Sequence, residues 1–210
     1  MTTTLNTAWH VNYEFGLTTR QPKPLLDRPT TAYRILDLPD PLLRKAVAIH
    51  EAGHAVLALH LGTRLTSVSV ADNLGREEGT AAGRTSYEPG QITPMRNVLL
   101  VSAAGERAQD RWLREKGLWS PERAWVVEIL AAQDRSVIDQ CVRPARPGGL
   151  TYGVSCDPTA DLAALHDHVD MWLHGLWEQV TALADALNQR GTLTGAQAAA
   201  VTGLALGEGA

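Results

Sequence analysis

One long apolar stretch predicts a helix over residues 40–61. Asp40-Pro41 at its start is typical of an N-cap followed by a proline in the first helical turn. Gly62 after its end is a residue that favours helix termination. Apart from Glu51, residues 46–63 contain no Asp, Glu, Lys or Arg. We therefore expect a single helix that is apolar on nearly every side.

Helical spacing of apolar positions recurs in the second half of the chain. The pattern predicts helices over residues 93–116 and 120–142, each opened by a Ser or Thr followed by proline. After a break rich in proline and glycine at 143–149, residues 158–188 predict one long amphipathic helix. A short last helix is expected after Thr194.

Two segments between the first two helices predict strands. Leu65 to Val70 alternate apolar and polar side chains, which is typical of a half-buried strand. Asn73-Leu74-Gly75 favours a turn, and the segment Gly79 to Tyr87, rich in Thr, Ala and Gly, is expected to return as a second strand. The expected fold class is therefore α+β and mostly α, with a small β-sheet beside the 40–61 helix and a helical C-terminal region.

Residues 1–39 differ from the rest and are treated as an extended N-terminal segment, separate from a domain over residues 40–210. Four prolines and a polar composition argue against regular structure in this segment. Its aromatic side chains Trp9, Tyr13 and Phe15 are expected to anchor it to the body of the protein.

The 40–61 helix carries His50-Glu51-Ala52-Gly53-His54. Residues four apart lie on the same helix face, so both imidazoles can reach one metal ion at a Zn–N distance of about 2.0–2.1 Å. Glu51 lies next to the first ligand, where it can take a proton from a water whose pKa zinc lowers to about 7. This is the H-E-x-x-H pattern of zinc peptidases. Burying two histidines and a carboxylate without partners is costly, and a metal ion satisfies all three.

Composition narrows the class of protein. A net charge of −4 gives no basic surface for nucleic acid, and no stretch reaches the roughly 18 apolar residues of a membrane span. The N-terminus lacks the basic and apolar regions of a signal peptide. Cys141 and Cys156 are too few for a disulfide framework and fit a reducing compartment. We expect a cytoplasmic protein, and the excess of arginine over lysine suggests a bacterial source with a GC-rich genome.

Catalytic zinc usually has three protein ligands, so a third must come from later in the chain. Asp134, Asp139 and Glu128 are the acidic candidates, and the C-terminal helix offers further histidines and an aspartate at positions 166, 167, 168 and 174. The spacing of the residues leaves these alternatives open. A second metal site on the C-terminal helix is conceivable, but histidines on the polar face of an amphipathic helix are far more common.

Three blocks of the chain resemble the protease domain of FtsH-type zinc peptidases. His50 to Val56, HEAGHAV, is similar to the motif helix of that family and is the most specific block. Residues 103–108, AAGERA, resemble a second family helix, and their small side chains allow close packing against the motif helix. Residues 131–134, AAQD, resemble the run whose aspartate completes the zinc site, although glycine and asparagine usually surround that aspartate. With weaker similarity at 180–195, the likeness spans residues 40–203.

The resemblance implies a zinc site formed by His50, His54 and Asp134, with Glu51 as the catalytic base. The implied activity is a zinc metalloendopeptidase that hydrolyses peptide bonds in flexible or unfolded protein segments. The chain has no P-loop pattern, so any ATPase or regulator would act in trans. The alternative is a non-catalytic binding or regulatory module with structural zinc. A narrower hypothesis places residues 1–39 across the cleft as a restraint on the protease.

Overall fold

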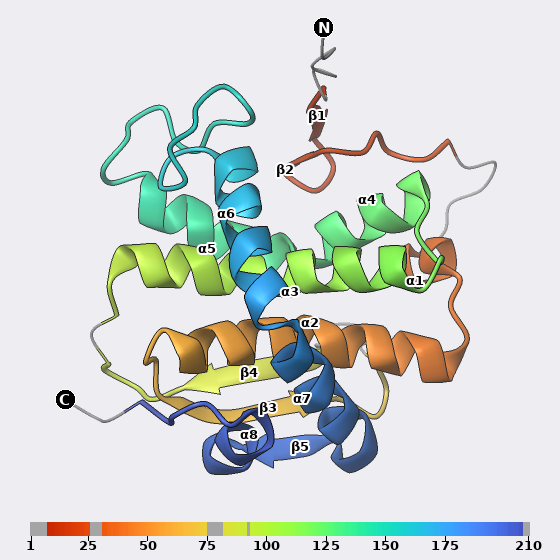
Figure 1. The fold of residues 1–210 in the computed structure, drawn as a ribbon. Coiled ribbons are helices and arrows are strands. Elements are labelled where there is room, and N and C mark those ends of the chain that lie inside the picture. Colours follow the sequence, from red (N-terminus) through yellow and green to blue (C-terminus); the bar gives the residue numbers. More distant parts are fainter. Residues whose placement is uncertain (1–7, 26–30, 75–81, 92, 208–210) are drawn as a thin grey trace, which may run out of the picture.

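Helix α2 (Asp40–His60) lies at the centre of an α+β fold. The computed structural model describes residues 8–25, 31–74, 82–91 and 93–207. From Ala46 to Leu59 almost every side chain of α2 is buried, as its apolar pattern predicts. Helix α3 (Met95–Glu115) packs along one side of α2, and a small sheet covers the other (Figure 1).

Small residues bring α2 and α3 into close contact. A Cβ atom at Gly53 would lie 2.6 Å from the carbonyl oxygen of Ala104, too close for any side chain. Ala108 of α3 lies at the same crossing. The expectation that the small residues at 103–108 pack against the motif helix is confirmed.

The sheet has the strand order β4-β3-β5, and all its pairings are antiparallel. Strand β3 (Leu65–Val70) has the predicted bounds, and β5 (Thr192–Thr194) pairs with its other side. Strand β4 (Gly83–Tyr87) is the predicted return strand, although positions 79–81 of that prediction lie outside the described residues. Because β3 is central, β4 is an edge strand, and it runs beside α2.

Two predicted helices are each divided in two. The helix expected over 120–142 is α4 (Pro121–Leu130) and α5 (Ala132–Val142), separated at Ala131, whose ψ of 14° departs from the helical value. The helix expected over 158–188 is α6 (Leu162–Gly175) and α7 (Trp177–Arg190), separated at Leu176 with a φ of −111°. The last predicted helix is α8 (Gly195–Thr202), which begins with a capping box formed by Thr194 and Gln197.

The predicted helix starts are partly wrong. Pro39 and Pro94 occupy the N-cap positions of α2 and α3, without a side-chain hydrogen bond, so Asp40 is already helical. Ser120 caps α4 as expected and accepts a hydrogen bond from the backbone N–H of Arg123. Asp161 performs the same role for α6.

The described part of residues 1–39 contains more regular structure than its prolines suggested. Strands β1 (His10–Asn12) and β2 (Leu17–Thr19) form an antiparallel hairpin, and α1 (Ala32–Leu36) packs against α4. Trp9 lies against Tyr152, and Phe15 makes an edge contact with Trp125. Tyr13, by contrast, is 90% exposed and anchors nothing.

Both cysteines have free thiols. Among the residues described, no helix has the length and apolar character needed to cross a membrane.

Candidate metal centre

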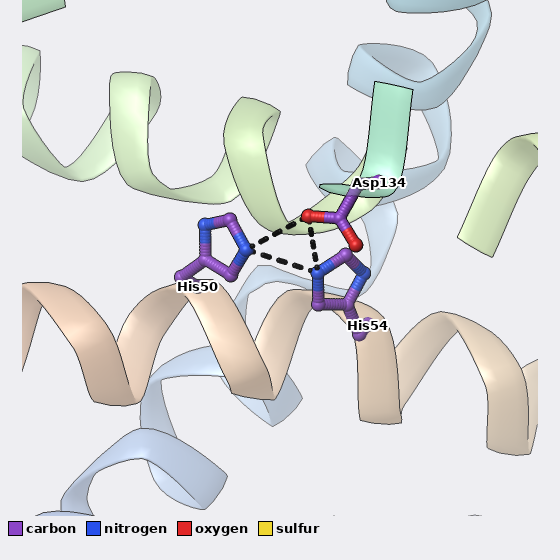
Figure 2. Close-up of side chains that lie close together, drawn as sticks. All are labelled: His50, His54 and Asp134. Atoms are coloured by element: carbon purple, nitrogen blue, oxygen red, sulfur yellow. Dashed lines mark hydrogen bonds and ion pairs between the residues drawn. The ribbon is translucent and has the colours of Figure 1, made fainter. Parts of the chain in front are cut away.

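His50, His54 and Asp134 converge on one point between α2 and α5 (Figure 2). The two imidazoles come from consecutive turns of α2, and their Nε2 atoms lie 3.0 Å apart. Oδ2 of Asp134, in the first turn of α5, lies 3.3 Å from Nε2 of His50 and 3.4 Å from Nε2 of His54. Three potential metal-ligand atoms therefore face one another.

Each imidazole is oriented by a partner at its other nitrogen. Nδ1 of His50 lies 3.2 Å from Oε1 of Gln109, and Nδ1 of His54 lies 2.7 Å from the backbone carbonyl oxygen of Val101. Because both partners are hydrogen-bond acceptors, each Nδ1 donates a proton to its partner, and each Nε2 is directed towards Asp134, where it can offer its lone pair to a metal ion. Histidines that bind metals are commonly held this way.

The electrostatics of this group favour a cation. Burial lowers the pKa of His54, but the carboxylate of Asp134, together with Glu51 and the Val101 carbonyl, raises it to about 9. Burial raises the pKa of Asp134, yet the imidazoles of His54 and His50 hold it well below its usual range. Without a proton or a metal ion, three acceptor atoms would face one another with no donor between them. Two imidazole nitrogens and a carboxylate oxygen are a donor set that suits zinc, so the residues present fit this ion.

Gly105 of α3 makes room for the two imidazoles. A Cβ at this position would overlap Nε2 of His54 and would lie 2.6 Å from Nε2 of His50. The backbone of α3 can therefore pass directly over the two rings only because residue 105 has no side chain.

Glu51 is held by the edge strand β4. The hydroxyl of Thr85 donates a hydrogen bond of 2.7 Å to Oε2 of Glu51. A Cβ at Gly83 would lie 2.6 Å from Cγ of Glu51, so glycine at this position leaves space for the carboxylate. Glu51 is 7% exposed and belongs to the wall of the same cleft as the histidines.

The cleft has a volume of about 820 Å³ and joins the metal-ligand group to β4. One part of its wall is apolar and includes Leu43 and Val47 of α2 and Val137 of α5. From the described N-terminal residues, Tyr33 and Leu36 line the cleft, whereas the β1–β2 hairpin packs against α4. The hypothesis that residues 1–39 lie across the cleft and restrain the protease stays a prediction: of the described part of this segment, α1 lines the cleft and the hairpin does not.

The other candidate ligands lie elsewhere. Glu128 accepts hydrogen bonds from Arg135 and from the backbone of Arg20 and Gln21. Asp139 forms an ion pair with Arg143 on the surface.

The C-terminal candidates do not form a second centre. His166 is buried, 3.6 Å from Glu106, while His168 contacts Arg96 and His174 is exposed. Asp167, 78% exposed, lies 4.0 Å from Arg20. Over the described ranges, His50, His54 and Asp134 are the one group with the proximity needed to hold a metal ion.

Sequence reasoning missed the residues that support the ligands. Gln109 is a polar residue four positions after Gly105, and this spacing places both on one face of α3. Its burial at 3% exposure marks it as a side chain with a specific partner. The sequence has no feature that marks Thr85 as a supporting residue, because threonine is common in strands for reasons of propensity alone.

No protein-family model matches this chain, and the curated proteins contain no match to it.

Proposed function

We propose that this protein is a zinc-dependent metalloendopeptidase that hydrolyses peptide bonds in flexible or unfolded protein segments. The observation that carries the proposal is the convergence of His50, His54 and Asp134 beside Glu51 at the wall of an 820 Å³ cleft. His50, His54 and Asp134 would hold the ion. A bound zinc ion would supply Lewis-acid polarisation of a carbonyl and a water of lowered pKa.

Glu51 is suited to the role of general base. Its Oε2 accepts the hydrogen bond from Thr85, and among the described residues Oε1 has no hydrogen-bond donor, so this oxygen is available to take a proton from water. The same oxygen can then give the proton to the departing amine, as general acid–base catalysis requires. Thr85 fixes the orientation of the carboxylate during both transfers.

The edge strand β4 supports binding of an extended peptide. Its outer side has no strand partner among the described residues, and it lies on the cleft wall beside Glu51. A segment that adds to such an edge must be extended, so flexible or unfolded chains are the expected substrates. A folded substrate would need an unfolding ATPase or a regulator acting in trans.

A closed structural zinc site is the less well supported alternative. Structural sites usually have four protein ligands, whereas the group found in the described residues has three. A structural site also gives no reason for a buried carboxylate at Glu51, held by a hydrogen bond beside the ligands.

The test is metal content and casein cleavage measured on the same purified samples. The wild type should contain one zinc ion per chain and cleave casein, and Glu51→Gln should keep the ion and lose cleavage. Glu178→Gln, an identical change at an exposed position of α7, is the matched control and should behave as the wild type. Full cleavage by Glu51→Gln would overturn the mechanism.

A further inference from the structure

On each of the helices α3 and α5, one residue lies at the candidate metal centre and the next residue in the sequence belongs to a buried ion pair. On α3, Gly105 passes over the imidazoles, and the next residue, Glu106, is buried in an ion pair. On α5, Asp134 faces the imidazoles, and the next residue, Arg135, is buried against Glu106. The position of the third ligand is thus tied to an ion pair one residue away.

Arg135 makes a set of short bonds although it is only 5% exposed. Its Nε and Nη2 atoms donate to the two carboxylate oxygens of Glu106, both at 2.7 Å. Nη2 also donates to Oε2 of Glu128 at 2.9 Å, and Nη1 donates to the backbone carbonyl of Thr18 at 2.5 Å. A planar guanidinium with five N–H donors can hold these partners together, whereas a lysine cannot.

The N-terminal hairpin completes this cluster. Glu128 accepts hydrogen bonds from the backbone N–H groups of Arg20 at 2.7 Å and Gln21 at 3.3 Å, just after β2. The hairpin is itself attached to α4, because Asn12 accepts a hydrogen bond from Nε1 of Trp125 at 3.2 Å. Buried charges on α3, α4 and α5 are therefore satisfied partly by the backbone of residues 18–21.

Asp134 depends on this support more than the two histidines do. His50 and His54 share α2, so the geometry of one helix fixes their separation. Asp134 comes from a separate helix that packs mainly against α3, after the break at Ala131. Removing one partner of a buried ion pair leaves an uncompensated charge, and the helices are expected to shift to hydrate it.

We propose that Arg135 is a positioning residue of the metal centre, and that the cluster of Arg135, Glu106, Glu128 and the β1–β2 hairpin holds Asp134 against His50 and His54. This inference rests on the proposed metal site. The inference gives residues 18–21 a supporting role. Their backbone bonds to Arg135 and Glu128 would keep α5 in the position that directs Asp134 at the histidines.

The test measures Co²⁺ binding to the metal-free full-length protein, by chelator competition and by the visible absorption spectrum of the bound ion. Arg135→Met should weaken Co²⁺ binding by about 10–100-fold and change the spectrum, as loss of support for a ligand does. Arg135→Lys keeps the positive charge but not the planar set of N–H donors, so its Co²⁺ affinity should lie between those of Arg135→Met and the wild type. The matched control is Arg111→Met, since Arg111 is a half-buried arginine of α3 that bonds to Glu115 and to the backbone carbonyl of Leu173, away from the cluster. Its dissociation constant should equal that of the wild type.

A substitution in the hairpin tests the second half of the proposal. Asn12→Ala removes the bond from Trp125 and the bonds that the Asn12 amide donates within the hairpin, without changing α5. It should weaken Co²⁺ binding while circular dichroism shows a folded protein. Wild-type affinity in Asn12→Ala would remove the hairpin from the proposal.

The remaining outcomes separate this proposal from the metal site itself. Wild-type affinity and spectrum in folded Arg135→Met would overturn the positioning role. If Arg135→Met does not fold, the comparison of Arg135→Lys with Arg111→Met decides the same question. A wild-type protein that binds no Co²⁺ would instead refute the metal site on which the proposal rests.

Discussion

The hydroxyl of Thr85 lies 2.7 Å from Oε2 of Glu51, a contact between the edge strand of the sheet and the helix that carries the histidines. Hydrogen bonds to charged groups contribute about 1.5–3 kcal/mol, and this one has both a short distance and a half-buried setting. The carboxylate is therefore oriented before any substrate enters the cleft.

Thr85→Val should lower kcat/KM for peptide cleavage by about 10–100-fold, because it removes this bond while keeping the shape of the side chain. Zinc content should not change, since Thr85 contacts no ligand of the proposed site. Kinetics on a fluorogenic peptide would measure the effect. Thr192→Val, at an exposed position of β5, is the matched control. Equal rates for Thr85→Val and the wild type would contradict this role.

Gly105→Ala should abolish or strongly weaken metal binding without removing any ligand. The added methyl group would overlap Nε2 of His54 and crowd Nε2 of His50. Alanine is favoured over glycine by about 1 kcal/mol within a helix, so propensity alone would not destabilise α3. Zinc titration calorimetry is the measurement. Gly175→Ala is the control, because a Cβ there meets no atom within 4 Å.

A comparison of Asp134→Ala with Asp139→Ala should show which of the two aspartates of α5 is the third metal ligand. At a zinc concentration 100 times the dissociation constant, binding stabilises the wild type by about 2.7 kcal/mol, and a chelator should remove this gain. Asp139→Ala should keep the zinc-dependent rise in melting temperature, since Asp139 pairs with Arg143. Asp134→Ala should lose most of it. The opposite pattern in thermal unfolding would make Asp139 the third ligand.

Lowering the pH should reduce the free energy of unfolding, because the buried carboxylate of Glu106 becomes protonated. Burial raises the pKa of this carboxyl, but the guanidinium of Arg135 and other nearby charges lower it to about 2, from 4.5 in an unfolded chain. Because the folded-state pKa is depressed, the stabilisation is fully present above about pH 4.5 and is lost as the pH falls towards 2.

Glu128 shares Arg135 with Glu106, and burial together with the Glu106 carboxylate raises the pKa of Glu128 to about 7, so the contribution of Glu128 opposes that of Glu106 above about pH 4.5. Urea unfolding of the wild type and of Glu106→Gln should therefore differ most near neutral pH and converge towards pH 2. Glu178→Gln should follow the wild-type curve throughout. A constant difference between wild type and Glu106→Gln over this range would show that the ionisation of Glu106 makes no such contribution.

Regular periodicity made the central elements predictable. Helix α2 and strand β3 have strong patterns of their own, and the His50–His54 spacing fixes which face of α2 carries the candidate ligands. The breaks at Ala131 and Leu176 carry no such pattern, because neither residue is glycine or proline and tertiary packing sets their dihedral angles. An uninterrupted helix over 120–142 would not direct Asp134 as α5 does.

The supporting contacts of the site are long-range and have no local signature. Arg135 and Thr18 are far apart in the sequence, and Thr85 reaches Glu51 only because β4 folds back beside α2. A pattern within a window of residues describes one element at a time. Such contacts depend on how elements pack, and the hairpin of residues 10–19 escaped prediction for the same reason.

The separation of the candidate ligands along the chain has a consequence for folding. Because the third candidate ligand, Asp134, lies 80 residues after His54, a bound ion would link two distant parts of the chain as a crosslink does. Bringing the three ligands together in the denatured ensemble would close a loop of that length, and the entropy lost on closure grows with the logarithm of loop length. The unfolded chain should therefore hold the ion far more weakly than the folded protein, so that unfolding and metal release occur together.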